Sequence, residues 1–522
     1  MFTNGAGRRD VVGAFGETGE NAMKHCRREF IKSIAATAIV PGLAKGTMTA
    51  EESTLTIEKN RMKPESTRRP KNVVLMICDD LGYGDLGCYG SKLKTPHLDK
   101  FAAEGTRFTH FNAAHPLCSA SRAALLTGRY AQRSHTIGAF HPNTKIGMSL
   151  QEVTLANLFQ NRGYRTHAIG KWHLGDALEY LPTKRGFDSF YGVPYSDDMQ
   201  PLPMIRDTTI LETDTDRDLL TTRYTEDALR FLEENAQKPF FLYFAYSYPH
   251  DPARASARFQ GASGLGDFGD SVQEIDWSVG EIVHSLERNG ILEDTLLLFT
   301  SDHGPWYQGN PGNLRGRKGS TFEGGFRVPF LAHWPAGLQA GTAQNAWATN
   351  LDILPTLAAL CGLDASPNPL DGIDISAILL DGQEDIPRKS LLYFTPLSSA
   401  NTDIHCARKG DWKLRLAQID GEMYINDYTT GHQSFWLPRP ELYNLALDPA
   451  ESYDVAKEHP EIVKAISEDV EAQIATMPEE VKQAYSLARK HVARSTTPPG
   501  GAPRPPSNEP LPPWAWEPID RR

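Results

Sequence analysis

The sequence is poor in cysteine, with six among 522 residues and none in a paired CxxC spacing. So few and so scattered thiols exclude a disulfide framework in a chain of this size, and they give no zinc signature. An excess of basic charge is also lacking, because the formal net charge is -11. Binding to nucleic-acid phosphates requires a basic face, so this charge argues against a nucleic-acid partner.

Long apolar runs are absent too. The apolar stretch Ser33 to Ala44 is interrupted by Pro41 and falls short of the about 20 residues that a membrane helix needs. It follows Arg27-Arg28, a pattern typical of a twin-arginine export signal. Residues 1–44 are therefore predicted to be such a signal with an N-terminal extension, and a basic disordered tail is the alternative. The signal predicts a periplasmic or secreted protein that uses the twin-arginine export machinery and has no stable membrane span.

Apolar runs of strand length are present and alternate with helical patterns. Asn72–Cys78 is continuously apolar, as in a strand buried on both faces, and similar runs recur at 240–246 and 295–300. Apolar residues at helical spacing run from Val272 to Leu286 and stop at Asn289-Gly290. Strands alternating with helices predict an α/β layered fold.

The hydrophobic pattern of the sequence changes near residue 385. Shorter alternating stretches, such as 412–416, and a helical segment at about 459–492 predict a smaller α+β domain. The last residues are rich in proline and contain Trp514 and Trp516. The predicted organisation is a linker at 45–70, a catalytic domain at 71–385, a C-terminal domain at 386–492 and a Pro-rich tail at 493–522.

Polar residues follow the predicted strands at their carboxyl ends, where open α/β sheets bind ligands. Asp79-Asp80 follow the first strand, His250 follows the second and Asp302-His303 the third, while a weaker strand at 166–169 leads to Lys171 and His173. Two adjacent carboxylates repel each other, and a bound cation would resolve this; oxygen ligands favour calcium or magnesium. A solvated turn is the alternative for the Asp pair taken alone.

Cys118 is predicted to lie at the start of a helix. Ser119 and Ser121 are good capping residues, a run of Ala and Leu follows, and Gly128 is placed to end the helix. The unpaired N–H groups and the dipole at a helix N-terminus favour an anion and lower a thiol's pKa. A small buried core residue is the alternative for a lone cysteine in an apolar stretch.

The segment Cys118-Ser119-Ala120-Ser121-Arg122, followed by Leu126-Thr127-Gly128-Arg129, resembles the signature of the type I, formylglycine-dependent sulfatases. In that family a maturation enzyme oxidises this cysteine to Cα-formylglycine; Ala120 stands where many members have proline. The resemblance runs from about 70 to 455 and is closest to the arylsulfatase A and N-acetylgalactosamine-6-sulfatase branch. It implies the alkaline phosphatase superfamily fold, a large mixed sheet flanked by helices with a smaller C-terminal antiparallel sheet.

The resemblance also implies the roles of individual residues. One calcium ion per chain is implied, with the ligands Asp79, Asp80, Cys118 as formylglycine, Asp302 and His303. The implied catalytic residues are Cys118, Arg122, Lys171, His173, His250 and Lys318. In the implied mechanism a hydroxyl of the hydrated aldehyde attacks sulfur, His250 and Lys318 assist the departing alcohol, and His173 helps a second hydroxyl to expel sulfate.

The leading hypothesis is a sulfatase that hydrolyses a sulfated small molecule or glycan, either a sulfated carbohydrate or an aryl sulfate. A phosphonate or phosphodiester hydrolase of the same superfamily is the first alternative. A noncatalytic binder of sulfated glycans, with Cys118 left as a thiol, is the second. Candidates for the pocket wall are His135, His141, Asp197, Asp198, Trp306 and Tyr307.

Overall fold

A ten-stranded sheet forms the centre of the computed structural model, which describes residues 69–136, 138–394, 403–416, 437 and 439–494. The predicted export signal, most of the predicted linker and the tail from residue 495 lie outside the described residues. In spatial order the strands are β11 (Thr342–Gln344), β2 (Thr106–Phe108), β10 (Phe330–His333), β9 (Thr295–Ser301), β1 (Asn72–Cys78), β8 (Phe240–Ala245), β4 (Arg165–Lys171), β5 (Ser189–Val193), β6 (Met204–Arg206) and β7 (Thr209–Glu212).

The middle of this sheet is parallel and its edges are mixed. Strands β9, β1, β8, β4 and β5 run in one direction, while β10 is antiparallel to β9, and β6 and β7 continue antiparallel beyond β5. The carboxyl ends of five strands therefore meet at one edge, as predicted for the strands that carry the polar residues. A two-stranded sheet pairs β3 (Phe111–Asn112) with β12 (Ala348–Thr349).

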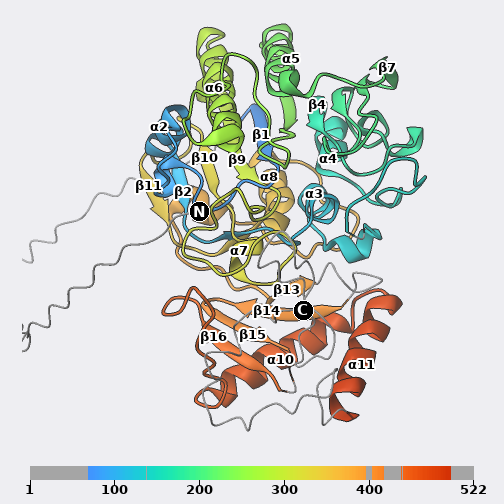
Figure 1. Ribbon diagram of the computed structural model, residues 1–522, viewed down its shortest axis with the longest axis vertical. Coiled ribbons are helices and arrows are strands. Elements are labelled where there is room, and N and C mark those ends of the chain that lie inside the picture. The colour runs from blue at the N-terminus through green and yellow to red at the C-terminus, as the bar shows by residue number, and fades with distance from the viewer. Residues whose placement is uncertain (1–68, 137, 395–402, 417–436, 438, 495–522) are drawn as a thin grey trace, which may run out of the picture. The chain divides into compact units, whose positions relative to one another are not determined.

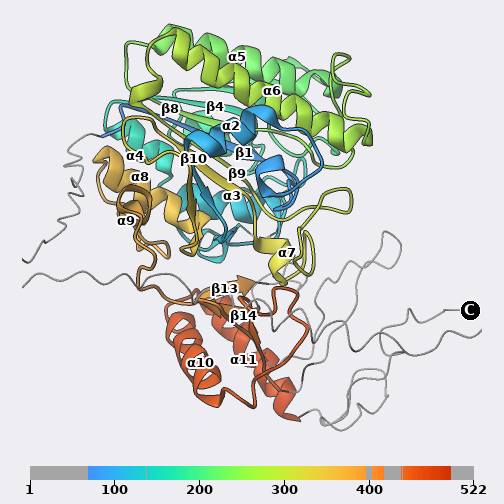
Figure 2. The ribbon, with the colours of Figure 1, turned by 90° about the vertical axis from the view of Figure 1, so that its left-hand side faces the viewer.

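Helices cover both faces of the large sheet (Figures 1 and 2). Alternate residues of β1 point into two separate cores: Val73, Leu75 and Ile77 into one, and Val74, Met76 and Cys78 into the other. One core includes α3 (Cys118–Thr127), α4 (Leu155–Asn161), α8 (Ile353–Cys361) and α9 (Ser376–Asp381). The other includes α2 (Pro96–Glu104), α5 (Leu220–Asn235) and α6 (Gly266–Arg288). Burial on both faces explains why β1 reads as an unbroken apolar run.

A four-stranded antiparallel sheet follows near the C-terminus. Its order is β13 (Leu391–Phe394), β14 (Ile404–Lys409), β15 (Trp412–Arg415) and β16 (Glu441–Asn444). The helices α10 (Pro460–Ile474) and α11 (Glu479–Arg494) share a core with it. The predicted helical segment at 459–492 is thus two helices, since Pro478 cannot continue the first one. The predicted fold class, a large mixed sheet plus a small antiparallel sheet, is confirmed.

The helix that carries Cys118 begins as predicted, but its expected caps have other roles. Leu117 is the residue before the first turn and makes no side-chain cap. Ser119 Oγ instead accepts from the N–H of Phe140 at 3.1 Å, and Ser121 Oγ donates to the carbonyl of Asp302. Both serines are buried, so they tie this helix to neighbouring loops. Gly128 ends the helix with a φ of 66°, as predicted.

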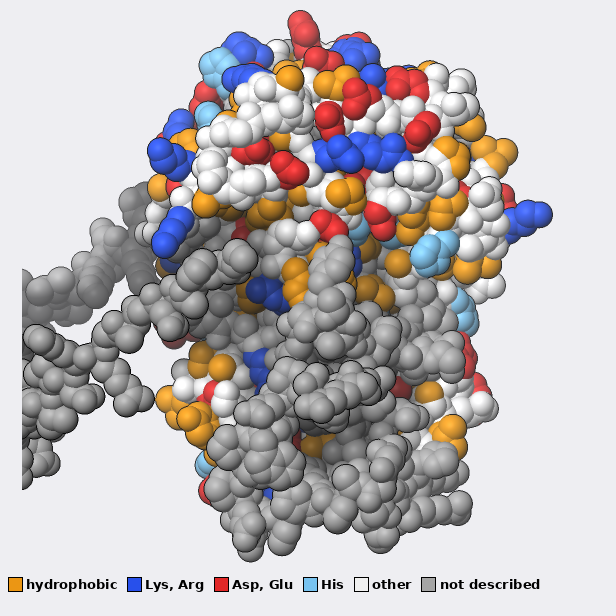
Figure 3. All heavy atoms as spheres, in the orientation of Figure 1, with side chains coloured by type: hydrophobic (Ala, Val, Ile, Leu, Met, Phe, Trp, Pro, Cys, Tyr) orange, Lys and Arg blue, Asp and Glu red, His pale blue; other side chains and the backbone are white. Residues whose placement is uncertain are grey.

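The surface in Figure 3 carries acidic and basic side chains interspersed over the described part of that face. The net charge of -11 is therefore not collected into one acidic patch there. Among the described residues, no helix has the length and apolar character needed to cross a bilayer.

Candidate active site

Three loops at the carboxyl edge of the sheet bring the predicted acidic residues together. Asp79 and Asp80 directly follow β1, and Asp302 directly follows β9, its parallel neighbour. The N–H of Asp80 donates to Asp302 Oδ1 at 3.3 Å, which links the two loops. All three carboxylates are buried. Charges buried in this way require partners within the protein or a bound ion.

Cys118 faces this acidic cluster from the first turn of α3. Its Sγ lies 3.2 Å from Nε2 of His303, and the same Nε2 lies 3.5 Å from Asp80 Oδ1. His303 Nδ1 lies 2.9 Å from the carbonyl of Gly304, which can only accept. The proton on Nδ1 is thereby assigned, and Nε2 is the nitrogen that faces the cluster. Burial lowers the pKa of His303, but Asp302 and Cys118 outweigh it and raise that pKa to about 9.

Three cations lie against the three carboxylates. Lys318 Nζ donates to both oxygens of Asp80 at 2.8 and 2.9 Å, and Lys171 Nζ donates to Asp79 Oδ2. Arg122 Nε donates to Asp302 Oδ2 at 3.1 Å, and Arg122 Nη2 lies 3.0 Å from the same oxygen as an ion pair. The side chains of Arg122 and Lys171 are fully buried and that of Lys318 is 12% exposed. The fixed charges of the cluster thus balance.

The cations set the pKa values in the cluster. Burial raises the pKa of Asp79, but Lys171 and the other nearby cations outweigh it and hold that pKa well below its usual value. For Asp80, burial outweighs Lys318 and raises the pKa to about 7. Burial also raises the pKa of Cys118, yet Lys171 and Lys318 more than offset this, so the pKa of the thiol is lowered. A lowered thiol pKa was predicted from the helix N-terminus, and the two lysines add to that effect.

The two predicted histidines flank the cluster in different ways. His173 Nε2 lies 2.9 Å from the carbonyl of Phe140, while its buried Nδ1 has no hydrogen-bond partner among the described residues. His250 places Nε2 3.9 Å from Asp80 Oδ2 and Nδ1 3.2 Å from Asp197 Oδ1. Burial, reinforced by Lys171 or Lys318, holds the pKa of both histidines well below the usual value.

The donors fit a hard divalent cation. Ligand atoms of Asp79, Asp80, Cys118 and His303 all lie within 4.8 Å of one another. Asp79 Oδ1 is buried and has no hydrogen-bond partner among the described residues, so it is available to an ion. Asp302, the fifth predicted ligand, is not among these four residues, although its Oδ1 lies 3.6 Å from Nε2 of His303. Carboxylate oxygens at this density are the ligands that calcium and magnesium prefer.

Of the candidates for the pocket wall, Asp197 lies within reach of the cluster. Trp306 lies beside Lys318, whose Nζ is 5.8 Å from the ring centre, and Tyr307 packs edge-on against Trp306 at 4.9 Å. His135 instead contacts Glu480 of α11 at 3.2 Å, and His141 and Asp198 are exposed. Ser196 is a site residue that the sequence does not predict, because a serine in a loop has no distinctive pattern. Its Oγ accepts a hydrogen bond from Lys171 Nζ at 2.8 Å.

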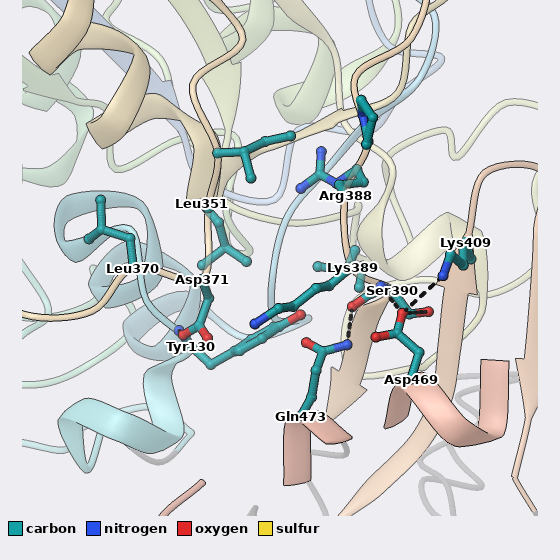
Figure 4. Close-up of a pocket in the computed structure, with 14 residues that line it drawn as sticks. Tyr130, Leu351, Leu370, Asp371, Arg388, Lys389, Ser390, Lys409, Asp469 and Gln473 are labelled. Carbon is teal, nitrogen blue, oxygen red and sulfur yellow. Dashed lines mark hydrogen bonds and ion pairs between the residues drawn. The ribbon is translucent and has the colours of Figure 1, made fainter. Parts of the chain in front are cut away.

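A separate cavity of about 420 Å³ lies beside the C-terminal sheet and shares none of the residues above (Figure 4). Several of its polar side chains are already paired. Asp469 accepts from Ser390 at 2.7 Å and lies 3.5 Å from Lys409, and Gln473 donates to the carbonyl of Ser390 at 2.9 Å. This cavity is lined by groups that stabilise the fold, and the chemistry is concentrated at the carboxyl edge of the large sheet.

Comparison with known proteins agrees with this geometry. Residues 71–363 match the family model described as Sulfatase, and residues 317–479 match the one described as N-sulphoglucosamine sulphohydrolase, C-terminal. The chain is 36% identical to human arylsulfatase A, over 84% of this chain and 94% of that protein. It is 35% identical to N-acetylgalactosamine-6-sulfatase from Canis lupus familiaris, over 74% and 82% of the two chains.

A solved structure of the PsFucS1 sulfatase from Pseudoalteromonas sp. superimposes with a TM-score of 0.72 at 28% identity, covering 80% of this chain and 92% of that one. The fold and these matches define a sulfuric ester hydrolase with the sheet of the alkaline phosphatase superfamily. The chain belongs to the sulfatase family. Both the predicted family and the predicted class of enzyme are confirmed.

Proposed function

We propose that this enzyme hydrolyses sulfate esters of sugars, with Cys118 oxidised to Cα-formylglycine and one calcium ion held by Asp79, Asp80, residue 118 as formylglycine, Asp302 and His303. The observation that carries the proposal is the place of Cys118. Its Sγ shares a 4.8 Å cluster with the oxygens of both aspartates and lies between two cations that lower the pKa of the thiol. A structural cysteine needs none of these neighbours.

When present, the two groups supply distinct chemistry: the hydrated aldehyde provides one hydroxyl to attack sulfur and a second to release sulfate, and calcium stabilises negative charge. The chain's own residues bind and orient the ester. Lys318 and Lys171 each place an ammonium beside the cluster, where sulfate oxygens can compete with Asp80 and Asp79 for them. Arg122 fixes the loop of Asp302 and approaches Asp79 at 3.4 Å.

The two histidines have opposite proton arrangements. His173 donates through Nε2 to a carbonyl, so its lone pair lies on Nδ1, which suits a base that removes a proton from the hydroxyl of residue 118. His250 directs Nε2 toward Asp80 and is the group placed to give a proton to the departing alcohol oxygen. The role of His250 follows from the nitrogen that faces Asp80, and the role of His173 follows from the nitrogen that has no hydrogen-bond partner among the described residues.

The balance of charge supports a sulfate ester as the substrate. Three buried carboxylates are matched by Arg122, Lys171 and Lys318. A calcium ion would add two positive charges, and a singly charged sulfate ester would then enter a site that is net positive. A sugar as the alcohol part is supported by the name of the relative N-acetylgalactosamine-6-sulfatase and by the aromatic pair Trp306 and Tyr307 beside Lys318.

The proposal extends to maturation and location. A formylglycine-generating enzyme is required as a partner, because the change from thiol to aldehyde needs an oxidant that this chain does not supply. The twin-arginine pattern supports export to the periplasm or the medium. The domain boundaries at 385/386 and 492/493 likewise remain predictions from the sequence.

The test measures sulfate release by enzyme matured in its native host, with sulfated monosaccharides and an aryl sulfate as substrates. We expect turnover of both by the unchanged enzyme and none by Cys118→Ala. Cys88→Ala is the matched control, because Cys88 is half-buried and lies outside the cluster. Undiminished turnover by Cys118→Ala would contradict the proposal. A large preference for an aryl phosphodiester would favour the phosphohydrolase alternative.

A further inference from the structure

Asp197 is a fully buried carboxyl group outside the predicted set of catalytic and metal-binding residues. It follows β5 in the loop 194–200, and its backbone carbonyl accepts from Arg217 Nε at 2.9 Å. Neither carboxyl oxygen has a hydrogen-bond partner among the described residues, although the side chain is completely buried. Leaving such a group unpaired costs on the order of 1–3 kcal/mol, so its placement calls for an explanation.

His250 supplies the nearest complementary atom. Its Nδ1 is also without a hydrogen-bond partner among the described residues, and it lies 3.2 Å from Asp197 Oδ1. The two atoms form no hydrogen bond here, although their separation is within hydrogen-bond distance. On the opposite side of the ring, Nε2 lies 3.9 Å from Asp80 Oδ2. The imidazole therefore stands between Asp197 and the acidic cluster.

We infer that Asp197 is a positioning residue that holds His250 with a proton on Nε2, facing the departing oxygen of the substrate. The inference rests on the proposed function, in which His250 donates that proton. The pair holds one proton on Nε2 and a second between Nδ1 and the carboxyl oxygen. When Nε2 gives its proton to the alcohol, the second proton stays on or moves to Nδ1, and the ring is left as a neutral imidazole.

An amide in place of the carboxyl group would break this arrangement. An asparagine oxygen would accept from Nδ1–H and leave Nε2 without a proton. An asparagine NH2 would donate to Nδ1, and loss of the Nε2 proton would then produce an imidazolate anion. In both cases His250 becomes a poor acid while its packing is kept.

A second cation is the competing explanation, since Asp79, Asp197 and His250 also present ligand atoms within 4.8 Å. The ammonium of Lys171 already donates to Asp79 Oδ2. Asp79 is also a ligand of the proposed calcium ion, so a second ion would have only Asp197 and His250 to itself. These are fewer ligands than a divalent cation takes, and this favours the carboxyl–imidazole pair.

The leaving group provides a readout that a purely structural role would not change. A phenolate with a nitro substituent departs without a proton, whereas a more basic phenolate needs one. We expect Asp197→Asn to lower kcat/KM for phenyl sulfate about 100- to 1,000-fold, within the range for loss of an acid catalyst. The same change should lower kcat/KM for 4-nitrophenyl sulfate less than about tenfold. Asp198→Asn, at the exposed neighbour, is the matched control.

The experiment uses matured full-length enzyme and a series of substituted phenyl sulfates. A steeper dependence on leaving-group basicity in Asp197→Asn, absent when His250 is already alanine, supports the inference. Equal losses for all substrates, or no loss, would overturn it. Two bound metal ions per chain falling to one in Asp197→Asn would also overturn it, in favour of a second cation. Lack of turnover by the unchanged enzyme would instead count against the proposed function.

Discussion

Glu323 gives a sharp test of how the C-terminal sheet is joined to the catalytic part of the chain. It opens α7 (Glu323–Phe326), and its carboxylate is fully buried. Oε2 accepts from Arg408 at 2.9 Å and from Arg327 at 3.0 Å, and Oε1 accepts from Tyr393 at 2.6 Å and lies 3.4 Å from Lys413. Three cations from different elements thus share one anion.

The substitution Glu323→Gln keeps the size of the side chain and removes its charge. Lys413 would then retain Glu451, 3.1 Å away, as a neighbouring carboxylate, whereas Arg408 and Arg327 would lose the negative charge of Glu323. Removing one partner of a buried ion pair costs about 3–5 kcal/mol, a large share of the roughly 5–15 kcal/mol that stabilises a folded domain. We therefore expect a loss of about 3–5 kcal/mol in the free energy of unfolding at pH 7.

The effect should depend on pH in a definite direction. Burial raises the pKa of Glu323, but Arg408, Lys413 and Arg327 outweigh it and hold that pKa well below its usual value. The stabilisation from this carboxylate is therefore present above the unfolded pKa, near 4.3, and is lost as the pH falls through the lower folded pKa. The difference between Glu323→Gln and the unchanged chain should shrink below about pH 4.

Urea unfolding followed by circular dichroism measures the difference, from the slopes and midpoints of the two transitions. Glu468→Gln is the control, because Glu468 is 67% exposed and pairs with Lys464 at the surface. Its effect should stay within about 0.5 kcal/mol. A loss smaller than about 1 kcal/mol for Glu323→Gln at pH 7 would refute the reasoning.

Two further predictions concern the sheet edge and the metal. Gly170 has a φ of 91°, and a Cβ there would lie 1.8 Å from the carbonyl oxygen of Ala245, so Gly170→Ala should prevent soluble expression. The control is Gly163→Ala, which should give folded protein because Gly163 has a similar φ of 88° but open space around it. Equal yields of the two variants would contradict the packing argument. Removing calcium with a chelator should lower both the Tm and the turnover, and calcium should restore both; an unchanged Tm in protein shown by elemental analysis to be free of metal would count against the ion site.

Much of the fold could be predicted because its central strands are buried on both faces. The continuous apolar runs at β1, β8 and β9 have no other simple explanation, and each ends beside a chemically active residue. The helix caps were predicted wrongly for a physical reason. Ser119 and Ser121 suit a helix start in isolation, but both bond to loops that are distant in sequence, and such tertiary contacts override local preference.

The site could be predicted in its composition but only partly in its geometry. The sequence predicts Asp302 as a metal ligand, but it does not predict that the oxygens of Asp302 also accept from Arg122 and from backbone N–H groups. The sequence predicts Asp197 and its neighbour Asp198 equally as residues of the pocket wall. In the structure the loop buries Asp197 next to His250 and exposes Asp198, a difference that two adjacent aspartates in a sequence do not reveal.

The state of residue 118 is the most direct test of the account. Mass spectrometry of the peptide containing this residue, from protein expressed in its native host, distinguishes the two chemical forms. We expect a peptide that has lost sulfur and two hydrogens and gained one oxygen, in proportion to the sulfate-releasing activity of the sample. A fully active sample in which every copy of the peptide carries an unmodified cysteine would contradict it.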